Sequence, residues 1–195
     1  MYHETYTLLN LSTVAINQGE GRIAISHAKR ANELSQKIGE RSGEAWSLLY
    51  LGYANLLEKN YAVAKDFFQE SVTIRTELGQ QSLAFEPAAG LIQVALQTND
   101  LVAASGETEK ILQHLEGGGS FEGTEEPLRI YLACYRALEK LRDPRSLDTL
   151  HEAVKLLETQ VSKLPDAEAC RMFIQNVPYR RDIQASWKNL QRGLN

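Results

Sequence analysis

The chain has 195 residues, of which 43% are hydrophobic and 24% charged, as in an ordinary soluble globular protein. Only 5 prolines occur, and the abundance of Ala, Leu, Glu, Gln and Lys favours helices. Residues 1–120 hold 9 basic and 14 acidic residues, a net charge of −5, and residues 121–195 hold 12 and 11, a net charge of +1. Neither part has the strongly basic character typical of a protein that binds nucleic acid directly.

A repeat runs through the first part of the chain. Three segments align at one constant shift, the first beginning at Leu8, the second at Leu48 and the third at Ala88. In each segment an apolar helical pattern runs to a polar break and a second helical pattern follows. The breaks are Gln18-Gly19-Glu20, Lys59-Asn60 and Asn99-Asp100. Each segment therefore predicts a helix hairpin, and the array predicts stacked hairpins.

The aligned columns alternate in side-chain size. Small residues recur where the two helices of a hairpin are expected to cross, and larger residues at neighbouring columns fill the groove between hairpins. The third segment departs from this rule because Ile92 and Ile111 stand where small residues are expected, so we expect its hairpin to be splayed. The columns are Leu11/Leu51/Leu91, Ser12/Gly52/Ile92, Ala24/Ala64/Ala104, Ala28/Phe68/Thr108 and Ala31/Ser71/Ile111.

A fourth helical pair is predicted after a glycine-rich loop, EGGGSFEGTEEP, that reads as a linker. Asp143-Pro144-Arg145 separates its two helices. Leu164-Pro165 ends the second of them, Asp166 is the expected N-cap of the next helix, and Val177-Pro178 interrupts that one. We therefore predict repeats at 2–39, 40–79, 80–116 and 124–164, followed by terminal capping helices at 166–192.

These columns resemble the tetratricopeptide repeat, a helix–turn–helix unit with a large residue, Leu, Gly/Ala, Ala, Phe and Ala at fixed offsets. The second segment carries that set as Leu48, Leu51, Gly52, Ala64, Phe68 and Ser71. The period, which is the interval from Leu8 to Leu48, exceeds the roughly 34 residues of the standard repeat. Together with Asp-Pro-Arg at 143–145 and Phe-x-x-x-Val-Pro at 173–178, this long period resembles the C-terminal repeat domain of MalT-like bacterial transcriptional regulators. The resemblance implies an all-α, right-handed superhelix of antiparallel hairpins, a single repeat domain over 1–195.

The segment NQGEGRIA at 17–24 also satisfies the glycine pattern of a dinucleotide-binding turn. Such a turn needs a strand before it, whereas Leu8–Asn17 has helical periodicity. The same position recurs one period later, at 57–64, without its glycines. We interpret Gly19 and Gly21 as turn residues, where a positive φ is often needed. Ala24 is interpreted as a helix-crossing contact.

No pattern in the chain indicates catalysis, a metal or a cofactor. His151-Glu152-x-x-Lys155 lacks the second histidine of a zinc-protease helix. Gly117-Gly118-Gly119-Ser120 lacks the Gly-Lys-Ser/Thr of a phosphate loop. We therefore expect no enzyme activity, no metal site and no cofactor.

The two cysteines, Cys134 and Cys170, have no metal-ligand spacing and are typical of reduced thiols in a cytoplasmic protein. The first residues lack a signal-peptide pattern, and no apolar stretch approaches the roughly 18 residues of a membrane span. Because the helical pattern is already under way at the start, we expect the chain to be a fragment of a larger protein.

In tetratricopeptide proteins the first helix of each hairpin lines the concave face, so the resemblance implies which residues meet a partner. The groove it implies is aromatic at one end, amide-bearing in the middle and basic at the other, which suits a peptide or helix with an acidic end. Packing between repeats, or a solvated charged face, explains the same residues without a partner. The implied partner-binding residues are Tyr6, Thr13, Asn17, Trp46, Tyr53, Glu86, Gln93, Gln97, Arg129 and Arg136.

The leading functional hypothesis is a non-catalytic interaction and sensor segment of a larger bacterial regulator. A protein or peptide partner is expected, without membrane or direct nucleic-acid binding. Two alternatives stay open: a domain of the same type of regulator that binds a small-molecule inducer, and a self-association module that forms a homo-oligomer.

Overall fold

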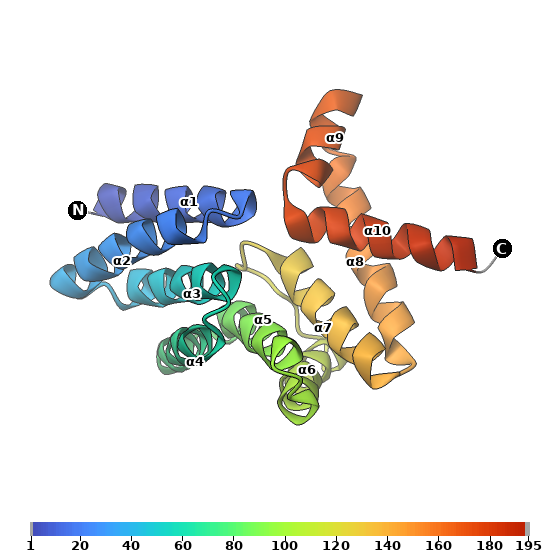
Figure 1. The fold of residues 1–195 in the computed structure, drawn as a ribbon, viewed down its shortest axis with the longest axis horizontal. Helices are drawn as coiled ribbons and strands as arrows, with labels where there is room; N and C mark the ends of the chain where they lie inside the picture. Colours follow the sequence, from blue (N-terminus) through green and yellow to red (C-terminus); the bar gives the residue numbers. More distant parts are fainter. Residues whose placement is uncertain (1, 194–195) are drawn as a thin grey trace. The chain divides into compact units, whose positions relative to one another are not determined.

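The computed structural model describes the backbone of residues 2–193. The chain divides into two compact units, of which the first ends at Glu125 and the second begins at Glu126. The first unit holds three antiparallel helix hairpins, and the second holds a fourth hairpin and two further helices (Figure 1). No strand occurs in the described residues, and the predicted all-α fold of repeated helix hairpins is confirmed. The grouping of all repeats into one domain stays a prediction.

The helices begin and end close to the predicted breaks. The helices of the first unit are α1 (Tyr2–Gln18), α2 (Gly21–Ile38), α3 (Arg41–Leu57), α4 (Tyr61–Glu77), α5 (Gln81–Gln97) and α6 (Leu101–Glu116). The helices of the second unit are α7 (Pro127–Leu141), α8 (Arg145–Val161), α9 (Ala167–Gln175) and α10 (Pro178–Gly193). Within 2–193, no helix is long and apolar enough to cross a membrane.

In the first unit the helices form two layers. Helix α1 contacts α3, and α3 contacts α5, so these three helices form what we call the first-helix layer. Helices α2 and α4 join successive hairpins, because α2 packs on α3 and α4 packs on α5. This order of contacts is the one expected of stacked hairpins, each of which contacts its neighbours.

Turns repeat with the same period as the helices. The backbone has a positive φ at Gly19 (79°), Lys59 (60°) and Asn99 (57°), which are equivalent positions of the three hairpins, and again at the equivalent Gly39 (67°) and Gly79 (70°). A left-handed residue after the last helical turn lets the chain reverse between helices. The prediction that Gly19 is a turn residue is confirmed.

Gly21 has a different role from the predicted one. It is the buried first residue of α2 and is not in the left-handed region. A Cβ there would lie 2.5 Å from Glu58 Oε1 and 3.1 Å from the Ala54 carbonyl oxygen. The prediction of a second turn residue is therefore wrong, because the missing side chain at Gly21 lets α2 approach the end of α3.

Phe68 on α4 has the largest fully buried apolar side chain of the described residues, with 0% of its surface exposed. Cβ atoms added at Gly52 on α3 and Gly90 on α5 would lie 2.5 Å and 2.3 Å from this ring. One period earlier, the positions of Phe68 and Gly90 hold Ala28 and Tyr50. The large side chain therefore comes from the first helix of a hairpin at one junction, as Tyr50, and from the second helix at the next junction, as Phe68.

The third hairpin is more open than the first two. Ile92 and Ile111, the residues that break the pattern of small columns, are both fully buried. Helices α5 and α6 contact each other less extensively than α1 and α2 or α3 and α4 do. Bulky side chains at a helix crossing hold the backbones apart, in agreement with the expected splay.

The second unit has its own core. Helix α10 packs against α7 and α8 and covers a cluster that includes the fully buried Leu150 and Ile183. Asp166 caps α9, as predicted, by accepting a hydrogen bond from Ala169 N at 2.8 Å. Both cysteines are free thiols, and burial raises the pKa of Cys134 to about 12.

Candidate partner-binding surface

The first-helix layer carries an aromatic cluster on α3. The Trp46 and Tyr50 rings are stacked, with centroids 6.1 Å apart, and the Arg75 guanidinium from α4 lies 4.4 Å from the centroid of Trp46. Trp46 is half-buried, and Tyr50 is buried. Trp46 is therefore the member of the cluster that can offer aromatic surface to another molecule.

Arg75 supports this cluster from beneath. Its side chain is 1% exposed and donates through Nη1 to Ser42 Oγ at 2.8 Å and to Gln80 Oε1 at 2.6 Å. Its Nη2 atom is buried and has no hydrogen-bond partner. Burial lowers the pKa of Arg75, and the negative charges of Glu86 and Glu40 oppose that shift. The Arg75 guanidinium is therefore a buried positive charge that packs on the Trp46 ring and holds it in place.

Tyr50 joins the aromatic cluster to the segment that follows α6. Its hydroxyl donates to Glu125 Oε2 at 2.6 Å, and burial, together with the Glu125 charge, raises its pKa well above the usual 10. The same segment packs on α5, because the Phe121 ring lies 6.0 Å from Phe85 in an edge-on arrangement. The loop predicted as a flexible linker therefore has fixed contacts with the first-helix layer.

Tyr53 and Glu86, two of the predicted partner-binding residues, are buried, with 5% and 4% of their surfaces exposed. The Tyr53 hydroxyl donates to the Glu86 carbonyl oxygen at 3.1 Å, and its ring meets Phe68 at 4.9 Å between centroids. In the structure these two residues tie α3 to α5, and their contact with a partner stays a prediction.

The other predicted residues of the first unit lie nearer the surface. Tyr6 is 53% exposed, and Thr13 and Asn17 on the same helix are half-buried. Gln93 is half-buried, whereas Gln97 is exposed and accepts a 3.5 Å hydrogen bond from the Tyr61 hydroxyl. First helices that contact one another therefore carry these aromatic and amide side chains.

Asn17 has one feature that the sequence could not indicate. Its Oδ1 atom is buried and has no hydrogen-bond partner. An acceptor left unsatisfied in this way costs about 1–3 kcal/mol. Because the atom is itself buried, an N–H group of another molecule does not reach it in this conformation.

The two predicted arginines lie in the second unit and are engaged by α10. Arg136 Nη2 is 2.6 Å from Asp182 Oδ2, and the Arg129 guanidinium lies 4.6 Å from the centroid of the Tyr179 ring. Both interactions help to hold α10 against α7. The predicted basic end of the groove is therefore used within the chain, and a partner would compete with α10 for it.

Sequence reasoning missed Arg75, Glu125 and Phe121 as neighbours of the candidate surface. The position of Arg75 shows no preference for one type of residue across the repeat, because the equivalent residues in the other hairpins are Ser35 and Leu115. Glu125 and Phe121 lie in a segment without periodicity. Among the described residues, no group of three or more His, Cys, Asp or Glu side chains is placed to hold a metal ion.

The stacked hairpins define an α-helical repeat protein. Residues 4–77, which span α1 to α4, match the tetratricopeptide repeat family. Repeats of this family generally mediate protein–protein interaction, and their fold is typically a non-catalytic module. No curated protein and no solved structure matches the chain significantly. The family match covers the two hairpins that keep small residues at the helix crossings and leaves out the splayed third one.

Proposed function

We propose that the first-helix layer of residues 1–125 binds a protein or peptide partner. The observation that carries this proposal is the aromatic surface of neighbouring first helices, where Tyr6 is exposed and Trp46 is half-buried and stacked on Tyr50. Tyr6 and Trp46 supply aromatic contact area at a low cost in side-chain entropy.

A peptide library displayed on phage tests this proposal, with the chain immobilised as bait. We expect Trp46→Ala to weaken a selected peptide by about 30-fold, the loss of roughly 2 kcal/mol typical of a hot spot. Since Trp46 also contacts Arg75, the exposed Tyr6→Ala provides a variant that leaves the cluster intact. Val102→Ala is the matched control, because Val102 is 85% exposed on α6, outside the layer.

The proposal fails if no peptide is selected. It also fails if selected peptides bind the Trp46 and Tyr6 variants as tightly as they bind the Val102 control. Circular dichroism of each variant separates a lost contact from a lost fold.

We further propose that the chain serves as an interaction and sensor segment of a larger, cytoplasmic bacterial regulator, where partner binding is passed to an attached ATPase or DNA-binding domain. The resemblance of the long repeat period and of the C-terminal segment to MalT-like regulators supports this. Sequencing the gene upstream of Met1 tests it. A reading frame that starts at Met1 without a preceding domain would remove this support.

Self-association is a second candidate, favoured by one face of α1. Leu11 and Val14 are 44% and 52% exposed, whereas Leu51 and Ala54, their equivalents on α3, are buried where α2 packs. A second copy could cover the α1 face. We expect light scattering to show a dimer that Leu11→Glu converts to a monomer, and a monomeric wild-type chain at high concentration would exclude this candidate.

A further inference from the structure

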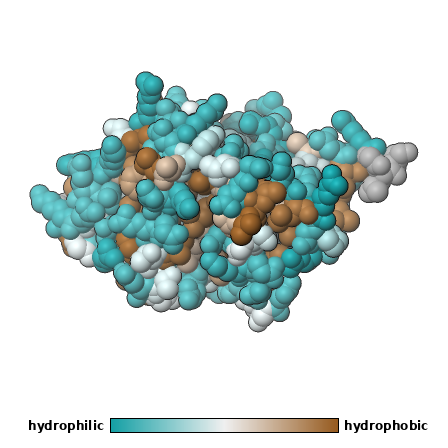
Figure 2. Space-filling model, turned by 60° about the horizontal axis from the view of Figure 1, so that its bottom comes forward, coloured by the Kyte–Doolittle hydropathy of each residue, from teal (hydrophilic) through white to brown (hydrophobic). Residues whose placement is uncertain are grey.

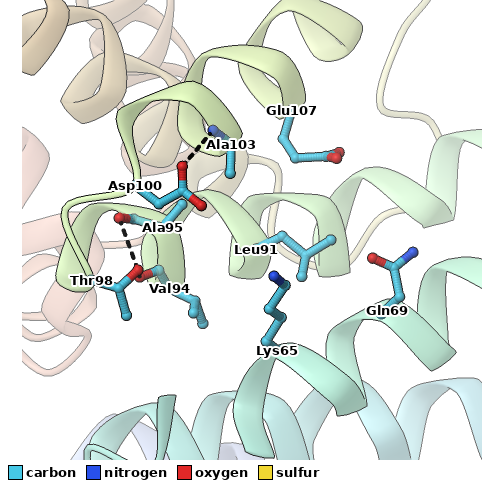
Figure 3. A pocket seen from close by; sticks show the side chains of 9 residues that line it. All are labelled: Lys65, Gln69, Leu91, Val94, Ala95, Thr98, Asp100, Ala103 and Glu107. Carbon is cyan, nitrogen blue, oxygen red and sulfur yellow. Dashed lines mark hydrogen bonds between the residues drawn. The ribbon is translucent and has the colours of Figure 1, made fainter. Parts of the chain in front are cut away.

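A cavity of about 250 Å³ opens between α4, α5 and α6 in the first unit. Its floor is the apolar surface of Leu91, Val94 and Ala95 on α5, all of them buried. Figure 3 shows Lys65 and Gln69 reaching toward this floor from α4, with Asp100 and Glu107 on the side of α6. Thr98 and Ala103 complete the lining.

The equivalent space one period earlier, between α2, α3 and α4, is closed by apolar side chains. One period before Lys65 and Glu107 stand Ile25 on α2 and Phe67 on α4. Both are half-buried and pack against the core cluster that contains Leu51. Around α5 the corresponding residues of α4 and α6 are charged, and the helices of the third hairpin are splayed, so the space stays open.

The wall on α4 offers hydrogen-bond donors. The Lys65 ammonium and the Gln69 amide are one helical turn apart, and both residues are exposed. Neither side chain pairs with another group in the described part of the chain. A negatively charged group in the cavity would meet both donors without displacing an existing partner.

The wall on α6 offers acceptors. Asp100 Oδ1 accepts from Ala103 N at 3.0 Å, and Glu107 Oε1 pairs with Lys110 Nζ at 2.7 Å. Each contact uses one carboxylate oxygen and leaves the other for a ligand. The Glu107 side chain is only 24% exposed, so a cation beside it would be partly shielded from water.

Figure 2 shows one face of the molecule, with hydrophobic areas separated by hydrophilic surface. The cavity combines both kinds of surface at close range, since an apolar floor lies between a donor wall and an acceptor wall. Its volume is below the roughly 300–1,000 Å³ of pockets for drug-sized ligands, so it suits a smaller molecule.

We propose that this cavity binds a small apolar amino acid in its zwitterionic form. The carboxylate meets Lys65 and Gln69, and the ammonium meets Asp100 and Glu107. The apolar side chain covers the floor at Leu91 and Val94. This function goes beyond partner binding and does not depend on it, because none of these lining residues is among the predicted partner-binding residues.

Calorimetric titration of the full chain with L-leucine tests the proposal. Two analogues each lack one charge: 4-methylpentanoate lacks the ammonium, and 3-methylbutylamine lacks the carboxylate. We expect leucine to bind at least about tenfold more tightly than either, because each analogue leaves one wall without its charged partner. Absence of leucine binding, or equal affinity for one analogue, would overturn the proposal.

The double variant Lys65→Ile/Glu107→Phe places in the cavity the residue types found one period earlier, at Ile25 and Phe67. We expect it to lose leucine binding by more than tenfold and to raise the melting temperature by a few degrees, because apolar groups fill the space. Should this variant not fold, Lys65→Gln removes the charge alone and is expected to weaken leucine by about tenfold. Lys29→Ile, an exposed site on α2, is the control that keeps wild-type affinity. Unchanged affinity in the folded cavity variants would place leucine elsewhere and refute the site.

Discussion

Phe68→Ala is expected to lower the free energy of unfolding by about 3–5 kcal/mol, the typical cost of emptying a phenylalanine site in a core. The cost lies toward the upper end because the ring is fully buried and lies directly against α3 and α5 at Gly52 and Gly90. Neither glycine has a side chain that can move into the space. Denaturant unfolding followed by circular dichroism measures the loss.

Phe67→Ala is the matched control for this prediction. Phe67 neighbours Phe68 on α4 but is only half-buried, so its removal should cost clearly less. Phe68→Ala combined with Gly90→Tyr reproduces the Ala28/Tyr50 pair found one period earlier, between the first and second hairpins, and should recover part of the loss. Equal effects at Phe67 and Phe68 would contradict the central role of the buried ring.

Arg75→Met is expected to lower the free energy of unfolding by about 2–3 kcal/mol. The two hydrogen bonds lost contribute about 1.5–3 kcal/mol each, and removing the buried charge offsets part of that loss. The change removes the donor for Ser42 and Gln80 and the positive charge near Glu86. Methionine keeps the apolar stem beneath Trp46, so the loss reports chiefly on the guanidinium. Urea unfolding at pH 7 measures it.

A double-mutant cycle identifies the electrostatic part of this loss. The deficit of Arg75→Met should shrink in a Glu86→Gln background, because that background lacks the negative charge of Glu86 near the guanidinium. The control is Arg30→Met, because Arg30 is exposed and its ion pair with Glu33 should contribute at most about 1 kcal/mol. A deficit equal to that of Arg30→Met would show that the buried charge does not support the cluster.

The sequence predicts the fold well because the features that repeat along it act on neighbouring residues. Small residues at crossings, apolar faces and polar breaks recur at the same point of each segment, and each acts on its own helix or turn. Lys59 and Asn99 take the left-handed backbone of Gly19 although they are not glycines, so position in the repeat determines the turn. Gly21 was misassigned because a close approach between helices depends on a distant residue, Glu58.

The candidate surface was predicted less completely. Position in the repeat placed Tyr6, Asn17 and Trp46 on first helices. It does not indicate how deeply a side chain is buried, and Tyr53 is buried by a contact with α5. The Glu125 contact joins residues 75 positions apart and has no counterpart in the repeat. A repeating local pattern does not indicate non-periodic contacts of this kind.

The Phe68 site also limits how such an array can lengthen by gene duplication. A tandem copy of residues 41–80 would place the equivalent of Tyr50, and not of Gly90, directly after the original hairpin. Its phenol ring would then occupy the volume of the Phe68 ring, since even one added carbon at Gly90 lies 2.3 Å from it. An inserted hairpin would therefore need a compensating glycine at that junction, which makes the order of the hairpins, and not only their number, part of what selection preserves.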